Sequence, residues 1–153
     1  MIDPMTTITF YRSDGIFYGF EEKGHVGFAD FGDDPFCAML SSLTMYIVDA
    51  IEDVYRGEVR YDINEDDTVI TVRSKSALPA YEDDERVRYA VSGLFLTYYA
   101  MLEDMAFTIG GKNLKVVSFS AESGDLAVEG EIDSVSYSRA ISRKSGIFAR
   151  IFR

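Results

Sequence analysis

The chain has 153 residues, of which 47% are hydrophobic and 14% aromatic, and this composition predicts one folded domain with its own core rather than a disordered chain. It contains no apolar run of about 18 residues, so we expect no membrane span, and its first residues lack the basic and apolar regions of a signal peptide. The single cysteine excludes an internal disulfide and fits a reducing compartment, so we expect the protein in the cytoplasm.

The formal net charge of -11 is unevenly distributed along the chain. Five of the 15 Lys and Arg residues lie after position 138, whereas all 26 Asp and Glu residues precede it, so residues 1–138 carry a net charge of -16. Such an acidic body repels nucleic acid and favours cationic partners, although an acidic surface also serves solubility alone.

The N-terminal region predicts a β-hairpin followed by a loop. Residues 6–12 and 16–23 are rich in β-branched and aromatic side chains, and Ser13-Asp14-Gly15 between them is typical of a hairpin turn. Three glycines permit unusual backbone angles in the loop that follows: Gly24, Gly27 and Gly32.

A long helix is expected after this loop. Asp34 is a favoured N-cap, Pro35 suits the first helical position, and Arg56-Gly57 places a cation and a C′ glycine at the end. Between them, apolar residues recur at helical spacing: Phe36, Leu40, Leu43, Ile47, Ile51 and Val54.

The second half of the chain predicts two strands, a helix and a further strand. Residues 58–63 and 68–74 alternate as strands around a turn at 64–67. The acidic stretch 82–85 then opens a helix that we expect to end near Glu103. Its apolar stripe consists of Val87, Ala90, Val91, Leu94, Phe95, Tyr98 and Leu102. Gly110-Gly111 leads into a strand at Leu114–Phe119, and residues 126–138 are a candidate for one more.

This order, β-β-α-β-β-α-β, predicts an α+β fold. Strands joined by tight turns pair antiparallel, so we expect a largely antiparallel sheet with two helices packed on it. Residues 1–120 form the expected domain, and residues 121–153 are a C-terminal extension with a basic tail, expected to belong to the same domain.

The only histidine, His25, and the only cysteine, Cys37, lie in one strand–loop–helix segment. These are the base and the nucleophile that a thiol hydrolase needs. Because Asp34 is the expected N-cap, Cys37 falls in the first helical turn, where backbone N–H groups and the helix dipole stabilise a thiolate. Ser41 lies one turn further on the same helix face and is able to donate a hydrogen bond to the sulfur or to the histidine.

A structural interpretation of each residue stays open beside the catalytic one. A lone helical cysteine is often a small buried hydrophobe, and a lone histidine is often an ordinary surface or packed residue. Asp34 serves equally as a simple cap, and Ser41 as a residue that allows close packing. One cysteine, one histidine and scattered carboxylates do not form a structural zinc site or a calcium loop, so we expect no metal and no cofactor.

The segment resembles the signature of the ribosomal-processing cysteine protease family, Prp. That signature is a Gly-His pair, a glycine-bearing loop and then G-x-D-x-x-C-A-x-x-S. In this sequence it reads Gly24-His25, the loop through Phe31, Gly32-Asp33-Asp34, Pro35-Phe36, Cys37-Ala38 and Ser41. The similarity extends to the order of elements over roughly residues 6 to 120, and it stops there.

The resemblance implies a cytoplasmic cysteine endopeptidase, acting as a homodimer, that removes the N-terminal extension of the twenty-seventh large-subunit ribosomal protein after a phenylalanine-containing motif. It implies Cys37 as the nucleophile, His25 as the base and later the acid, and Asp34 and Ser41 as supporting residues. The loop glycines would let the loop close over the substrate.

Two features depart from the family pattern. The pair before the cysteine is usually two aliphatic residues, whereas here it is Pro35-Phe36, which predicts a sharper helix start and an altered substrate pocket. The C-terminal tail, SRAISRKSGIFARIFR, is the second departure. It fits a docking element for ribosomal RNA, a self-association strand, or a basic terminus folded back on the acidic body.

Two other functions stay open at the level of sequence. One is a non-catalytic binding module of the same fold that recognises a ribosomal or assembly partner. The other is a thiol hydrolase or transferase that shares the site but acts on another substrate.

Overall fold

The computed structural model describes residues 6–24, 35–64, 66–109 and 114–120, with residues 35–37, 108, 109 and 114–120 described by their backbone. In chain order the elements are β1 (Thr6–Ser13), β2 (Ile16–Gly24), α1 (Pro35–Asp49), the π-helical turn η1 (Ala50–Val54), β3 (Arg60–Asn64), β4 (Val69–Arg73), the 3₁₀ turn η2 (Lys75–Ala77), α2 (Glu85–Ile109) and β5 (Leu114–Ser120). The predicted order of strands and helices is confirmed. The candidate strand at 126–138 lies outside the described residues.

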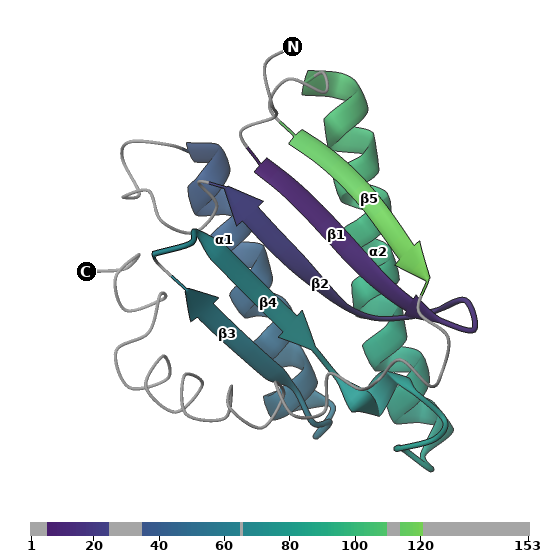
Figure 1. Cartoon of the computed structure of the whole chain (residues 1–153). Helices are drawn as coiled ribbons and strands as arrows, with labels where there is room; N and C mark the ends of the chain where they lie inside the picture. The colour runs from purple at the N-terminus through teal and green to yellow at the C-terminus, as the bar shows by residue number, and fades with distance from the viewer. Residues whose placement is uncertain (1–5, 25–34, 65, 110–113, 121–153) are drawn as a thin grey trace.

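The five strands form one sheet in the order β3-β4-β2-β1-β5. Three neighbouring pairs are antiparallel, and only β1 and β5 run parallel. Figure 1 shows α1 and α2 side by side behind the sheet, so the described residues form one layer of strands and one layer of helices. The α+β class and the largely antiparallel sheet are therefore as predicted.

The β1–β2 hairpin turns at the predicted residues. Asp14 and Gly15 both have positive φ, 51° and 78°, as a two-residue turn between twisted strands requires. Further along β2, a Cβ on Gly19 would lie 2.4 Å from the carbonyl oxygen of Val72. This glycine therefore lets β2 and β4 approach as closely as they do.

Helix α1 begins at Pro35 as predicted, but its end differs from the prediction. The residue with the left-handed conformation is Arg56, with φ 57°, and not Gly57. The Gly57 N–H donates to the Ile51 carbonyl at 2.8 Å, and a Cβ there would meet Ile51 and Ser76. Gly57 is thus needed for close packing. Val54, expected on the apolar face, is 69% exposed because the π-helical turn shifts the helical phase.

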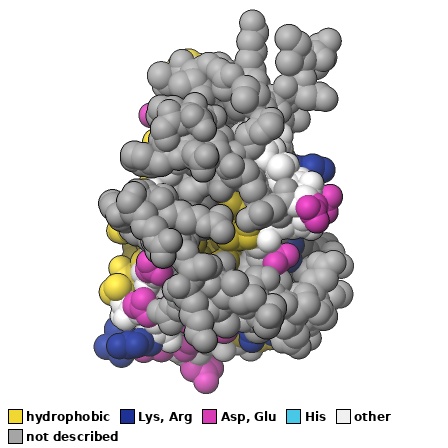
Figure 2. All heavy atoms as spheres, turned by 90° about the vertical axis from the view of Figure 1, so that its left-hand side faces the viewer, with side chains coloured by type: hydrophobic (Ala, Val, Ile, Leu, Met, Phe, Trp, Pro, Cys, Tyr) yellow, Lys and Arg dark blue, Asp and Glu magenta, His cyan; other side chains and the backbone are white. Residues whose placement is uncertain are grey.

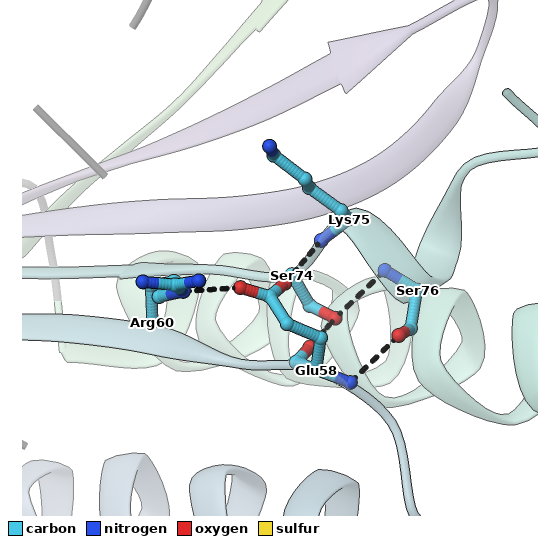
Figure 3. A network of polar contacts seen from close by, with 5 residues as sticks. All are labelled: Glu58, Arg60, Ser74, Lys75 and Ser76. Carbon is cyan, nitrogen blue, oxygen red and sulfur yellow. Dashed lines mark hydrogen bonds and ion pairs between the residues drawn. The ribbon is translucent and has the colours of Figure 1, made fainter. Parts of the chain in front are cut away.

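A polar network explains why β3 starts at Arg60 instead of 58 (Figure 3). The Glu58 N–H donates to Ser76 Oγ at 2.7 Å, and the Glu58 carbonyl accepts from Ser74 Oγ. These side chains from the end of β4 and from η2 satisfy the Glu58 backbone, so it takes no part in the strand ladder. Arg60 pairs with the Glu58 carboxylate, whose other oxygen accepts from the Lys75 N–H.

Helix α2 ends six residues later than predicted. Asp84 caps it by accepting the Arg86 N–H at 2.9 Å, and it ends at Ile109. The expected apolar stripe is at least partly buried, with Val91, Phe95, Tyr98 and Leu102 in the core. Beyond Glu103, Met105 and Ala106 pack against the same core, and this extends the helix.

The core lies between the helices and the inner face of the sheet. Phe10 and Phe20 from β1 and β2 are fully buried and make edge-to-face contacts with rings of α2, with centroid distances of 5.1–6.0 Å between Phe20 and Tyr98 or Phe95. Within the described segments, no helix is both long and apolar enough to span a bilayer. Figure 2 shows hydrophobic atoms near the middle of one face, and both acidic and basic side chains of the described residues toward its edges.

Candidate active site

Strand β2 ends at Gly24, the glycine of the Gly-His pair. Gly24 has φ 122°, a conformation that L side chains rarely adopt, and its N–H donates to the Thr68 carbonyl at 3.0 Å. This turn of the backbone fixes the direction in which the chain leaves the sheet toward position 25. Gly24 thus adopts one of the unusual backbone angles that the glycines of this segment were expected to permit.

Cys37 is the third residue of α1. Its backbone therefore belongs to the first helical turn, where N–H groups have no partner within the helix and the helix dipole is positive. This agrees with the placement expected from Asp34 and Pro35. A thiolate at this position is stabilised relative to one in the middle of a helix.

Ser41 follows one turn after Cys37 on α1 and is buried. It interacts with another part of the protein, so it is not without a partner. The next serine, Ser42, instead donates to the Ala38 carbonyl at 2.9 Å on the same helix. The two neighbours therefore differ in which face of the helix they occupy.

The remaining predicted site residues lie outside the described residues. These are His25, Asp34, Gly27 and Gly32. In the chain they fall between Gly24 at the end of β2 and Pro35 at the start of α1, and their roles stay predictions.

One polar residue in this region was not anticipated from the sequence. Glu22 on β2 is completely buried, and its Oε1 accepts from Thr44 Oγ1 at 3.0 Å and from Tyr98 Oη at 2.6 Å. Burial raises the pKa of this carboxyl to about 7, against the lowering effect of the two hydrogen bonds. Side chains of a strand alternate between the two faces of the sheet, so position 22 lies on the same inner face as buried Phe20. This alternation is the signal in the sequence that indicates the burial of Glu22.

The described residues also form a cavity of about 870 Å³. Its walls come from the β1–β2 turn, the later part of α1 and α2 as far as Met101, and they are mostly apolar. Of the predicted site residues whose side chains or backbone turn are described, neither Gly24 nor Ser41 lines it. Among the described residues no group of three His, Cys, Asp or Glu side chains is placed to hold a metal ion.

The fold and the placement of position 37 define an α+β protein with a cysteine at a helix start, and the comparisons give its class. The family model described as cysteine protease Prp matches residues 5–115. The chain therefore belongs to the Prp family and is a cysteine protease. The comparison with curated proteins finds no match.

Solved structures share this fold. SMU.848 from Streptococcus mutans is 25% identical, with a TM-score of 0.59, and the match covers 76% of this chain and 99% of that one. The essential ribosomal processing protease Prp from S. aureus, with a covalently linked product peptide, is 16% identical, with a TM-score of 0.58 over 75% of this chain and 100% of that one. The structure of the same S. aureus protein with a substrate peptide is also 16% identical, with a TM-score of 0.57, and the match covers 75% of this chain and 100% of that one.

Proposed function

We propose that this protein is a ribosomal-processing endopeptidase that removes the N-terminal extension of the twenty-seventh large-subunit ribosomal protein. The observation that carries the proposal is the family match, which runs through residues 5–115 and so includes both His25 and Cys37. The likeness to a ribosomal processing protease bound to substrate and product peptides supports a peptide substrate.

In the proposed mechanism, Cys37 is the nucleophile and His25 is the general base. His25 removes the thiol proton, and the thiolate attacks the scissile carbonyl carbon to form a tetrahedral intermediate. As the C–N bond breaks, the imidazolium gives its proton to the leaving amine, which leaves an acyl group on Cys37. Water then attacks the thioester, with His25 again taking a proton, and releases the new C-terminus and the free thiol.

The start of α1 contributes to this chemistry through its backbone. A free thiol has a pKa of about 8.5, so most of it is protonated at neutral pH. The N-terminal turn of a helix stabilises the thiolate through its free N–H groups. Asp34 and Ser41 are proposed to support the pair, and Gly24, Gly27 and Gly32 to let the loop close over the substrate.

The acidic body of the protein fits a cationic substrate. Residues 1–138 carry 26 acidic and ten basic side chains, and ribosomal proteins are basic. Charge of opposite sign accelerates encounter, with an effect that salt weakens. We further propose that the protein acts in the cytoplasm as a homodimer. Contact with nucleic acid is expected only through the basic C-terminal tail.

The test is cleavage of a synthetic peptide that carries the extension and its phenylalanine motif. We expect wild-type protein to cut at one bond after the motif, and Cys37→Ala and His25→Ala each to abolish cutting. Cleavage that survives Cys37→Ala overturns the proposed mechanism. If the wild-type protein binds the peptide without cleaving it, the protein is a binding module. If it cleaves other substrates of thiol hydrolases but not this peptide, it is a different hydrolase.

A further inference from the structure

Glu22 occupies the centre of a row of aliphatic residues that crosses the sheet. Its register partners are Ile8 on β1 and Ile70 on β4, and the next residues outward are Val116 on β5 and Ile63 on β3. Ile8 and Ile70 are 0% and 1% exposed. Burying a carboxyl group in such a row costs free energy unless the group is hydrogen-bonded and stays neutral, or is paired with a cation.

The hydrogen bonds of Glu22 are asymmetric. Both donors, Thr44 Oγ1 on α1 and Tyr98 Oη on α2, bond to the same oxygen, Oε1. The other oxygen, Oε2, is buried and has no hydrogen-bond partner among the described residues. A neutral carboxylic acid fits this arrangement, because its carbonyl oxygen accepts two bonds and its hydroxyl carries no charge. An ionised carboxylate would leave a charged oxygen without a donor.

No cation among the described residues compensates a charge on Glu22. From α2 the titratable group that faces it is Tyr98, whose own pKa burial raises well above its usual value. From α1 the facing group is the hydroxyl of Thr44, and from β1 and β4 the neighbours are isoleucines. The effects on the pKa of Glu22 are burial and the hydrogen bonds from Tyr98 and Thr44, with no ion pair among them.

The cluster Glu22–Thr44–Tyr98 joins the two elements that lead to the catalytic positions. Glu22 lies on β2, three residues before position 25, and β2 ends in between at Gly24. Thr44 lies on α1 seven residues after Cys37, which is two helical turns on the same face, with buried Ser41 between them. The hydrogen bond from Thr44 to Glu22 therefore ties the helix of Cys37 to the strand that precedes His25.

We propose that Glu22 is a positioning residue for the protease reaction, which through its hydrogen bond from Thr44 holds β2 and α1 in the relative position that Cys37 and His25 require. Ionisation strengthens the two hydrogen bonds but places an uncompensated charge in the aliphatic row, so the environment of the catalytic pair changes with pH. This role of Glu22 rests on the proposed catalytic pair of Cys37 and His25. Glu22 acts on the pair through β2 and α1 and not by contact with the substrate or the reacting atoms.

The test uses the full chain and follows alkylation of Cys37 by iodoacetamide as a function of pH, which is specific because the chain has one cysteine. Glu22→Leu removes both hydrogen bonds and fits the aliphatic row, so the fold should persist. We expect its alkylation rate at about pH 6 to fall about tenfold, as a rise of one unit in the thiol pKa would cause. Glu22→Gln keeps an acceptor oxygen and cannot ionise.

The pH profile separates positioning from a purely structural role. Wild-type protein should show a second inflection near the Glu22 pKa of about 7, whereas Glu22→Gln should follow a single titration. The matched control is Glu21→Gln, one residue away on β2, whose carboxylate accepts from Tyr11 Oη at 3.2 Å outside the cluster. It should retain the wild-type profile.

Two results overturn the proposal. One is a folded Glu22→Leu protein with the wild-type rate at pH 6, and the other is the same inflection in Glu22→Gln as in wild type. Should Glu22→Leu not fold, Thr44→Val and Tyr98→Phe each remove one donor and take its place in the same measurement. If Cys37 of the wild-type protein reacts as an ordinary thiol, the proposed catalytic pair itself is overturned. If Cys37 is activated but its alkylation rate is the same in the Glu22 variants, only the role of Glu22 is overturned.

Discussion

Tyr98 on α2 donates a hydrogen bond of 2.6 Å to Glu22 on β2, across 76 residues of sequence. Both side chains are buried, with exposures of 4% and 0%. The contact places an acid in the centre of the core of this cysteine protease, next to the strand and helix that lead to its proposed catalytic residues.

Stability should decrease with rising pH because of Glu22. Its pKa is about 7 in the folded protein and 4.5 ordinarily, so between these values the native protein holds a proton that the unfolded chain has released. The contribution of Glu22 to the free energy of unfolding is therefore full below about pH 4.5. It falls as the pH rises to about 7 and does not change further above that pH. The shift corresponds to at most about 3 kcal/mol.

The measurement is urea unfolding at several pH values for wild type and for Glu22→Gln. The difference between their free energies of unfolding should change over this window in the direction stated, while Glu21→Gln should run parallel to wild type. Parallel curves for wild type and Glu22→Gln would show that Glu22 titrates normally.

Gly19→Ala should destabilise the sheet. Its Cβ would lie 2.4 Å from the Val72 carbonyl oxygen and 2.9 Å from the Arg73 side chain, so β2 and β4 must separate. We expect a loss of about 1–3 kcal/mol, as for overpacked positions.

The matched control for this change is Gly93→Ala on α2. Apart from its chain neighbours and the backbone of its own helix, no atom of the described residues lies within 4 Å of a Cβ at this position, and alanine favours a helix by about 1 kcal/mol over glycine. The midpoint temperature of thermal unfolding should therefore decrease for Gly19→Ala and increase for Gly93→Ala. Equal shifts would contradict the role assigned to Gly19.

Ser41→Ala should reduce proteolysis more than Ser42→Ala. Ser41 is buried one turn after Cys37, whereas Ser42 donates to the Ala38 carbonyl on its own helix. Loss of a hydrogen bond to a charged group is worth about 2 kcal/mol, so kcat/KM should fall by at least about tenfold in Ser41→Ala. Similar activity in the two variants, measured on the peptide substrate, would exclude a supporting role for Ser41.

Residues 1–120 should fold without the C-terminal extension. The described sheet is complete at Ser120, where β5 ends beside Arg12 of β1. A chain truncated after residue 120 should show a cooperative melting transition and retain activity on the peptide. Loss of cooperative unfolding would place residues 121–153 within the folding unit, and loss of activity alone would assign them to substrate binding.

The predictions that held rest on local signals. Alternating residues around Asp14-Gly15 are sufficient for a hairpin, because that turn requires positive φ at both central positions. Pro35 marks the first residue of α1, since its fixed φ and missing N–H suit that position. The helix phase then places Cys37 in the first turn.

The predictions that failed depend on contacts between distant segments. The left-handed residue after η1 is Arg56, since Gly57 is held against Ile51 and Ser76. Strand β3 starts later than expected, because side chains from the segment after β4 satisfy the Glu58 backbone. Helix α2 runs to Ile109, because Met105 and Ala106 still reach the core.

The sequence by itself determined the class of this protein, since the Gly24-His25 pair, the spacing to Cys37 and the order of elements are all local properties. Only the tertiary structure decided the state of Glu22. In the sequence it is one acidic residue among 26, and its raised pKa comes from burial, which outweighs the lowering effect of two hydroxyls, from α1 and α2, that packing brings to one of its oxygens. The pKa of a carboxyl is set by the burial and donors around it, and the sheet and helices supply both only after the chain has folded.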